Sequence, residues 1–206
     1  MGLIKKLNFY RPQKISKSLK KAVFIFLFMK LLYSLIDDQY ENNGFIETRQ
    51  IVRAVVVDIK TNKVCLMHLV DNDIFGERNY FETPGGGVNK NETLLEALKR
   101  ELKEEIGVNN ISSIQEIGRV DDFYNLIKRK NINHYYLVYT DYSSHLPTSW
   151  EEKEKVRFEG IYWFDIDTAI DNFKSVKMNN IATLVVRREL PILLKARKMI
   201  KKHDNI

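Results

Sequence analysis

Cysteine is nearly absent from this chain of 206 residues, and no apolar run is long enough to cross a membrane simply. The single cysteine, Cys65, has no second cysteine with which to form an intrachain disulfide, which fits a reducing compartment. The apolar stretch at residues 22–36 is interrupted by Lys30, and a helix of that length rises only about 22 Å against a hydrocarbon core of roughly 30 Å. No small-residue cleavage site follows it, as a secretory signal would require. We therefore expect a cytoplasmic protein.

Carboxylates are missing from residues 1–36, which carry eight cations. Together with the apolar stretch, this predicts a basic and apolar helical arm over residues 1–46, ahead of a domain over residues 47–206. Two interpretations of the arm stay open. Its apolar face packs on the domain or on a second copy of the chain, which would make a homodimer. Alternatively, the arm attaches peripherally to an anionic membrane surface, where an apolar face and a polybasic flank act together.

The net charge of +6 is unevenly distributed along the chain. Residues 187–206 carry seven cations and two acids, so the two basic ends leave a net charge of −7 for residues 37–186. Faces that bind nucleic acids concentrate Lys and Arg around the site. The sequence therefore carries no DNA-binding signature, and its acidic middle suits divalent cations.

The hydrophobic periodicity predicts an α/β (α+β) fold in which a mixed sheet is packed against helices. A hairpin rich in Val and Ile comes first, a polar loop is expected at residues 71–78, and the helix that follows the glycines ends at Gly107, a good left-handed cap. The expected strands are 51–59, 64–70, 79–83, 114–121, 133–142 and 161–164, and the expected helices are 91–106, 167–173 and 180–202, the last bent near Pro191.

Three carboxylates, Glu101, Glu104 and Glu105, fall within an arc of about 100° on the helix expected at 91–106. Like charges at this spacing destabilise a helix, and the dipole disfavours anions near its C-terminus. The buried stripe of this helix consists of Leu94, Leu98, Leu102 and Ile106, and Glu105 projects close to its edge. Because partly desolvated carboxylates are costly without a cation, the pattern predicts a hard divalent metal ion.

The run Pro84, Gly85, Gly86 and Gly87 lets the backbone turn sharply and approach a ligand closely. Its carbonyls can then coordinate a metal, and its amides can meet phosphate oxygens. Glu92 and Arg100 lie eight residues apart, too far for neighbours on an ideal helix. If Glu92 precedes the first turn, it can fold back to orient Arg100.

The segment at residues 86–108 resembles the Nudix box, G-x5-E-x7-R-E-U-x-E-E-x-G-U, where U is aliphatic. Chance fills such a pattern very rarely. The matching positions are Gly86, Glu92, Arg100, Glu101, Leu102, Glu104, Glu105, Gly107 and Val108. The resemblance implies an α/β/α sandwich and hydrolysis of a diphosphate linkage in a nucleoside diphosphate derivative, by attack of water on phosphorus.

The resemblance also implies roles for individual residues. Glu101, Glu104 and Glu105, with the carbonyl of Gly85, would bind Mg²⁺ or Mn²⁺, and Arg100, held by Glu92, would position a metal-binding glutamate. The general base stays open between Glu101 and an acid of the loop at residues 150–159, of which Glu154 is our candidate. The other acids considered for this role are Glu151, Glu152 and Glu159, and more weakly Asp121 and Asp122.

The substrate is a nucleotide derivative whose identity the sequence leaves open among sugar nucleotides, dinucleoside polyphosphates, oxidised nucleotides and capped RNA ends. Candidates for phosphate contacts are Arg49, Arg53 and the backbone of Gly86 and Gly87; candidates for stacking on a base are Tyr80, Phe81, Phe123, Tyr124 and Tyr135. His134 is interpreted as a strand residue that makes an ordinary hydrogen bond. The alternative function is a catalytically silent Nudix-fold module that binds or senses a nucleotide. The complete glutamate set argues against that alternative.

Overall fold

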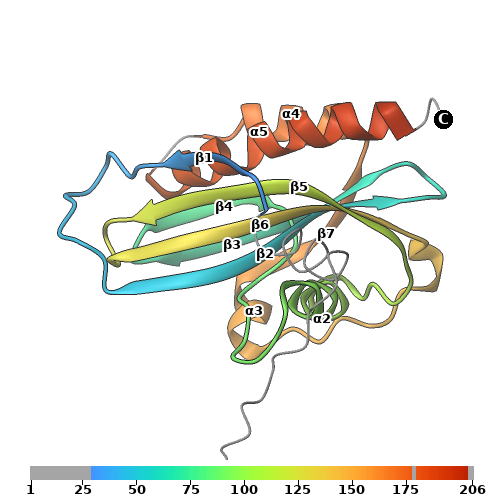
Figure 1. Ribbon diagram of the computed structural model, residues 1–206, viewed down its shortest axis with the longest axis horizontal. Helices are drawn as coiled ribbons and strands as arrows, with labels where there is room; N and C mark the ends of the chain where they lie inside the picture. The colour runs from blue at the N-terminus through green and yellow to red at the C-terminus, as the bar shows by residue number, and fades with distance from the viewer. Residues whose placement is uncertain (1–28, 178–179, 204–206) are drawn as a thin grey trace, which may run out of the picture.

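A mixed seven-stranded sheet with helices on both faces organises the residues that the computed structural model describes, 29–177 and 180–203. The strand order is β1-β5-β6-β2-β3-β4, and β7 pairs with the free side of β3. Helices α4 and α5 lie on one face, and α2 and α3 lie on the other (Figure 1). The strands are β1 Leu31–Leu35, β2 Glu47–Asp58, β3 Val64–Asp73, β4 Gly76–Glu82, β5 Ile111–Tyr124, β6 Arg129–Thr140 and β7 Phe158–Phe164. The helices are α2 Leu94–Ile106, α3 Glu152–Arg157, α4 Ile166–Lys174 and α5 Asn180–His203. This confirms the expected α/β sandwich.

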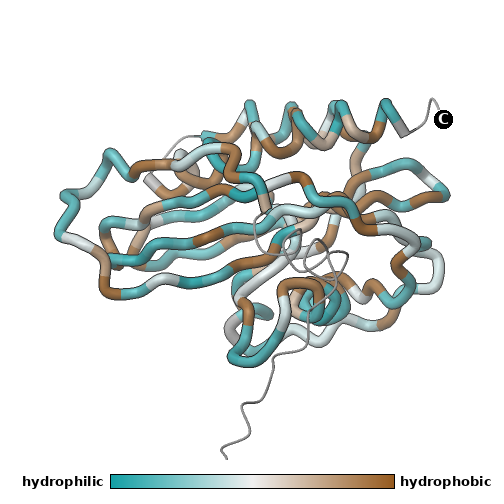
Figure 2. The backbone as a smooth tube through the Cα atoms, in the orientation of Figure 1, coloured by the Kyte–Doolittle hydropathy of each residue, from teal (hydrophilic) through white to brown (hydrophobic). Residues whose placement is uncertain are grey.

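Strand β2 forms the centre of the sheet because its Val-rich sequence is buried on both faces. Val52, Ala54 and Val56 pack with α2, whereas Val55 and Val57 pack with α4 and α5. The apolar positions of α5 lie on the side turned toward the sheet (Figure 2). The strand pairs in parallel with β6 along its whole length.

The partner of β2 on its other side changes along the strand, and this change creates the site. Near its end β2 pairs with β3, at Val57 and Val64. Nearer the start of β2, residues 84–87, which we call the glycine segment, lie beside it. Val52 N donates to Gly86 O at 2.9 Å, and Ala54 N donates to Pro84 O at 3.0 Å. Strands β3 and β4 therefore diverge from β2, and the glycine segment takes the place of β3 beside β2.

Helix α2 begins at Leu94, three residues later than the sequence pattern predicted. Thr93 is the N-cap and forms a reciprocal capping box with Glu96. At the other end Gly107, with φ of 70°, provides the left-handed cap that was predicted. The late start leaves Glu92 in the turn before the helix.

The expectation of a helix in the N-terminal arm is wrong for residues 31–35, which form strand β1. This strand lies parallel to β5 at the edge of the sheet, and Lys30 O accepts a hydrogen bond from Arg119 N at 2.8 Å. Tyr33 and Leu35 pack against the core beneath α5. Residues 1–28, with most of the basic charge, lie outside the described residues, so the boundary at residues 46 and 47 stays a prediction. Within the described ranges, no helix is long and apolar enough to cross a membrane.

Candidate active site

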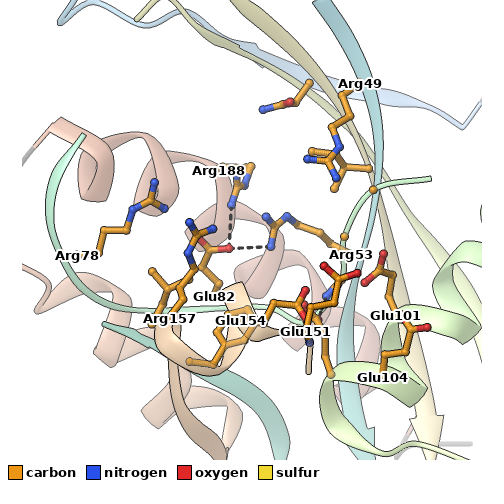
Figure 3. A pocket seen from close by; sticks show the side chains of 18 of the residues that line it. Arg49, Arg53, Arg78, Glu82, Glu101, Glu104, Glu151, Glu154, Arg157 and Arg188 are labelled. Carbon is orange, nitrogen blue, oxygen red and sulfur yellow. Dashed lines mark hydrogen bonds and ion pairs between the residues drawn. The ribbon is translucent and has the colours of Figure 1, made fainter. Parts of the chain in front are cut away.

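A cavity of about 580 Å³ opens where β3 and β4 leave β2, and its charged lining has two parts (Figure 3). Glu101, Glu104 and Glu151 lie at one side, and Arg78, Arg157 and Arg188 lie at the other. The lining carboxylates are Glu82, Glu101, Glu104, Glu105, Glu151 and Glu154. The lining arginines are Arg49, Arg53, Arg78, Arg100, Arg129, Arg157 and Arg188. The acidic centre expected from segment charges is therefore an acidic end of a cavity that also collects arginines.

The two glutamates on the inner side of α2 are buried against the glycine segment. Glu105 is 4% exposed, and its Oε2 accepts a hydrogen bond from Gly85 N at 2.6 Å. A side-chain carbon added at Gly86 would lie 2.6 Å from the carboxylate of Glu101, so a larger residue would require that carboxylate to move. Burial raises the pKa of Glu105 well above its usual value, and the charge of Glu101 raises it further. Burial likewise raises the pKa of Glu101, against the opposing hydrogen bond from Arg100.

Arg100 connects the turn before α2 to the glutamates on the helix. Its Nε and Nη2 donate to the two oxygens of Glu92, at 2.8 and 3.0 Å. Its Nη1 donates to Glu101 at 2.8 Å and to Glu104 at 3.0 Å, and its Nη2 also donates to Gly87 O at 2.9 Å. The predicted contact between Glu92 and Arg100 is present, and Arg100 also donates hydrogen bonds to two of the candidate metal ligands.

The carboxylates at the glutamate end of the cavity have the chemistry that a hard divalent cation requires. Glu101, Glu104 and Glu105 offer carboxylate oxygens, which Mg²⁺ and Mn²⁺ prefer, and the burial of two like charges side by side favours a compensating cation. The three do not converge on one point, because Arg100 holds Glu101 and Glu104 while Glu105 bonds to Gly85. Among the residues placed in the structure, no group of three or more His, Cys, Asp or Glu side chains has a metal-binding arrangement.

The acidic segment at residues 150–159, expected to be a loop, contains helix α3, and only some of its acids line the cavity. Glu151 and Glu154 line it, and Glu154 Oε2 accepts from Glu151 N at 2.8 Å. Glu152 pairs with Lys155 at the surface, and Glu159 pairs with His68. The segment is fixed beside α2 because Trp150 Nε1 donates to Glu105 O at 2.7 Å. Of the acids on this segment, Glu151 and Glu154 remain candidates for the general base.

The weaker acid candidates have other partners. Asp121 pairs with Arg119 and Lys130, and Asp122 pairs with Arg188 beneath α5. The structure does not bring either carboxylate into the cavity lining.

Arg53 lines the cavity but is already engaged. It is 9% exposed, and its Nη1 donates to Glu82 Oε2 and to Thr83 O, both at 3.0 Å. Burial acts to raise the pKa of Glu82, but Arg53 and Arg188 outweigh burial and hold that pKa below its usual value. This ion pair gives Arg53 a structural partner besides any phosphate.

Arg188 of α5 was not anticipated from the sequence. It is 2% exposed, and its guanidinium donates to Asp122, Tyr124 and Glu189. The signal that would have found it is its position on the buried stripe of α5, between Leu184 and Ile192. A charged residue at such a position requires buried partners.

Most of the aromatic residues considered for stacking on a base do not line the cavity. Tyr80 is buried away from this cavity, in the core under α5, with its hydroxyl accepting from Arg78 Nη1 at 3.2 Å. Of the five aromatic residues considered for base stacking, only Tyr124 lines the cavity. Phe75 also lines it, and it was overlooked because residues 71–78 were expected to be a polar loop, whereas they form the end of the β3–β4 hairpin, including its turn. His134 makes the ordinary hydrogen bond that was predicted, with Gln50 at 2.7 Å.

Comparison with known proteins agrees with the fold and the glutamate helix. A model of the NUDIX domain matches residues 48–184, well over half of the chain, and the chain belongs to the Nudix family. An RNA pyrophosphohydrolase from Pelagibacter ubique (strain HTCC1062) is 40% identical over 62 residues, which cover 30% of this chain and 37% of that relative.

Solved structures show the same fold at low sequence identity. A MutT Nudix hydrolase from Burkholderia pseudomallei has a TM-score of 0.50 and 18% identity, over 68% of this chain and 97% of the other. An ADP compounds hydrolase has a TM-score of 0.55 and 16% identity, over 81% of this chain and 80% of the other. Strand β1 and the end of α5 that carries Arg188 lie outside the range matched by the family model.

Proposed function

We propose that the protein is a metal-dependent hydrolase that cleaves a diphosphate linkage in a nucleoside diphosphate derivative, by attack of water on phosphorus. The observation that carries this proposal is the pair of buried carboxylates, Glu101 and Glu105, held against the glycine segment by Arg100 and Gly85. Two buried like charges are unfavourable unless a cation joins them, and a diphosphate brings such a cation with it.

Each residue at the glutamate end of the cavity has a role in the proposed reaction. Glu101, Glu104 and Glu105 hold Mg²⁺ or Mn²⁺, with Gly85 beside them, while Arg100 orients Glu101 and is itself fixed by Glu92. A bound divalent ion neutralises diphosphate oxygens and lowers the pKa of the attacking water. The backbone of Gly86 and Gly87 lies where it can approach phosphate oxygens.

The general base is Glu101 or an acid of the segment beside α2, where Glu154 is our first candidate and Glu151 the second. Glu154 lines the same cavity, and its charge contributes, after burial and nearer groups, to raising the pKa of both Glu101 and Glu105. Its place in the wall of the cavity that Glu101 and Glu105 line makes it a candidate to act on water bound there. Replacing each with Gln separates the candidates. Loss of the general base removes the rise of kcat with pH on the acidic limb of the profile, and only Glu101→Gln also weakens binding of the metal.

The test is hydrolysis of a substrate panel with Mg²⁺ and with EDTA, with products identified by mass. The panel holds sugar nucleotides, dinucleoside polyphosphates, nucleoside triphosphates and, because of the relative named as an RNA pyrophosphohydrolase, RNA with a 5′-triphosphate. We expect Glu105→Gln to lower turnover at least about 100-fold, since it removes a charged ligand. Glu116→Gln, at an exposed acid of β5, is the matched control and keeps wild-type turnover.

The same panel decides against the alternative function. A catalytically silent binding module would give a heat of nucleotide binding in calorimetry but would leave every compound unchanged, with or without Mg²⁺. An enzyme converts at least one compound only with the metal present. Wild-type turnover in Glu105→Gln would show that the metal assignment is wrong.

The location and assembly of the protein are part of the proposal. We infer a cytoplasmic enzyme whose basic arm packs on the domain, forms a homodimer or touches an anionic membrane. Because β1 belongs to the sheet, the arm is tested by removing residues 1–28 only. Sedimentation with anionic liposomes at low salt and molar mass by light scattering, each with and without these residues, separate the three arrangements.

A further inference from the structure

Asn131, in strand β6, has a buried carboxamide without a partner. The residue is 6% exposed, and its Oδ1 has no hydrogen bond. No hydrogen bond joins the carboxamide to another residue of the described part of the chain. Because a buried polar group left unpaired is unfavourable, its presence requires an explanation. Asn131 lines the cavity of the active site, so its partner can come from a bound ligand.

Asn131 lies next to Arg49, the candidate for a phosphate contact. It stands directly opposite Arg49 in the parallel pairing of β2 and β6, and paired strands are about 4.8 Å apart. Arg49 lies against the glycine segment: a side-chain carbon added at Gly87 would be 2.3 Å from its Nη2. Gly87 in turn accepts a hydrogen bond from Arg100. The lining therefore runs from the glutamates over the glycine segment to Arg49 and then to Asn131.

The cavity that Asn131 lines also has apolar side chains in its wall. Phe75 and Tyr124 line this cavity in an edge-to-face arrangement, with ring centroids 5.8 Å apart, and Ile127 and Ile181 add apolar surface. The same lining also carries Arg78, Arg129 and Arg188, and apolar ring surface beside a carboxamide can hold a heteroaromatic ring. A carboxamide offers one acceptor and two donors, which matches the adjacent donor and acceptor on the edge of a nucleobase.

We propose that Asn131 determines base specificity, by hydrogen bonding to the edge of the substrate's nucleobase while the diphosphate lies at the glutamate end. Arg49, which forms no ion pair with any residue in the described ranges, binds a phosphate between the two. The proposal rests on the proposed function, since it names how the same site recognises the nucleoside.

The experiment compares Asn131→Leu with wild type on four ribonucleoside triphosphates and on tripolyphosphate, which has no base. The wild type prefers one nucleoside. In Asn131→Leu, kcat/KM for that nucleoside falls about 10-fold or more, mainly through KM, whereas the value for tripolyphosphate changes less than about twofold. Asn72→Leu, on the exposed part of the β3–β4 hairpin, leaves all five values unchanged.

Stability provides a readout that separates a ligand contact from a structural one. Leu at position 131 removes an unpaired buried amide, so the thermal midpoint stays equal or rises. A large loss of stability would reveal a structural partner and overturn the proposal. An equal fall for tripolyphosphate and for all nucleosides, or no base preference in the wild type, would overturn it too.

Binding of α,β-methylene triphosphate analogues, which resist hydrolysis at that bridge, is measured in parallel by calorimetry. If the wild type hydrolyses nothing, the proposed function fails, but this measurement still decides the role of Asn131. Weaker binding of the preferred base analogue alone in Asn131→Leu supports the proposal. Unchanged binding contradicts it.

Discussion

Glu92 and Arg100 are eight residues apart in the sequence, yet both carboxylate oxygens of Glu92 accept hydrogen bonds from the guanidinium of Arg100, at 2.8 and 3.0 Å. The contact forms because α2 begins at Leu94, which leaves Glu92 free to turn back along the helix. The hydrogen bond from Arg100 also holds the pKa of Glu92 below its usual value. The pair fixes the plane of the guanidinium, so that Nη1 points at Glu101 and Glu104.

Arg100→Lys is the substitution that tests this positioning. Lysine keeps the charge but has one ammonium group, which cannot hold Glu92, Glu101 and Gly87 in a fixed plane. We expect turnover to fall at least about 10-fold. We expect the free energy of unfolding to change by no more than about 1 kcal/mol, because these pairs are partly exposed.

Steady-state kinetics and urea denaturation measure the two effects. The matched control is Lys99→Arg, one residue earlier on the exposed side of α2, which leaves both unchanged. Wild-type turnover in Arg100→Lys would mean that orientation of the glutamates does not limit the reaction.

Gly85→Ala tests the close approach of the glycine segment to β2. A side-chain carbon at this position would lie 2.1 Å from Val52 O, and Gly85 has φ of 138°, which other residues rarely adopt. Strain and overlap together should cost about 3 kcal/mol or more of unfolding free energy.

The control for this prediction separates strain from overlap. Gly76→Ala has a comparable positive φ, of 88°, but meets nothing within 4 Å, so we expect a loss of only about 1 kcal/mol. Equal losses in the two variants, measured by urea denaturation, would contradict the role assigned to the contact with Val52.

The glutamate helix could be predicted from the sequence because its determinants are local. The stripe of Leu98, Leu102 and Ile106, the cap at Gly107 and the crowded acids all lie within one segment, and the structure places them as expected. Strand β1 could not be predicted in this way. Its sequence is apolar without clear alternation, and what makes it a strand is pairing with residues 119–122 of β5, far along the chain.

Other arginines of the cavity, besides Arg49, Arg53 and Arg100, were missed for a related reason. Arg78, Arg157 and Arg188 come from β4, α3 and α5, and each lies in a segment whose own pattern says nothing about the others. The net charge of −7 over residues 37–186 only adds up all the acids and cations of that stretch, and Arg188 lies beyond it. It does not tell which charges meet once the sheet has formed, so it indicated an acidic centre where the cavity has two charged ends.

Adjacent arginines on α5 allow a matched test of the buried ion cluster. Arg188 is 2% exposed and bonds to Asp122, Tyr124 and Glu189, whereas Arg187 lies at the surface and bonds to Asp38. Removing one partner of a buried pair leaves an uncompensated charge, so Arg188→Met should lower the free energy of unfolding by about 3–5 kcal/mol.

The control is Arg187→Met, for which we expect a change below about 1 kcal/mol. Denaturation in urea at pH 7 measures both variants. If the two losses were equal, Arg188 would not be buried against its partners in solution, and the inner wall of the cavity would differ from the one described.

The pH dependence of stability tests the surroundings of His134. Burial, together with the charge of Arg119, lowers the pKa of His134 to about 4 against an opposing effect of Asp121. Nε2 lies 2.7 Å from Gln50 Oε1, and Nδ1 is buried without a hydrogen-bond partner, so the folded protein favours the neutral ring. The unfolded chain takes up a proton near pH 6.5, which the folded chain resists. The stabilising contribution is therefore fully present above about pH 6.5 and is lost as the pH falls toward 4, up to about 3 kcal/mol.

His134→Gln isolates this contribution from that of the carboxylates. Glutamine cannot protonate, so the decrease in unfolding free energy between pH 7 and pH 4.5 becomes smaller in the variant than in the wild type. His145→Gln, at an exposed histidine, retains the wild-type slope. Urea denaturation at intervals of half a pH unit measures all three proteins. Parallel curves for His134→Gln and wild type would show that the imidazole titrates alike in the folded and unfolded chain, which the unpartnered Nδ1 inside the sheet does not allow.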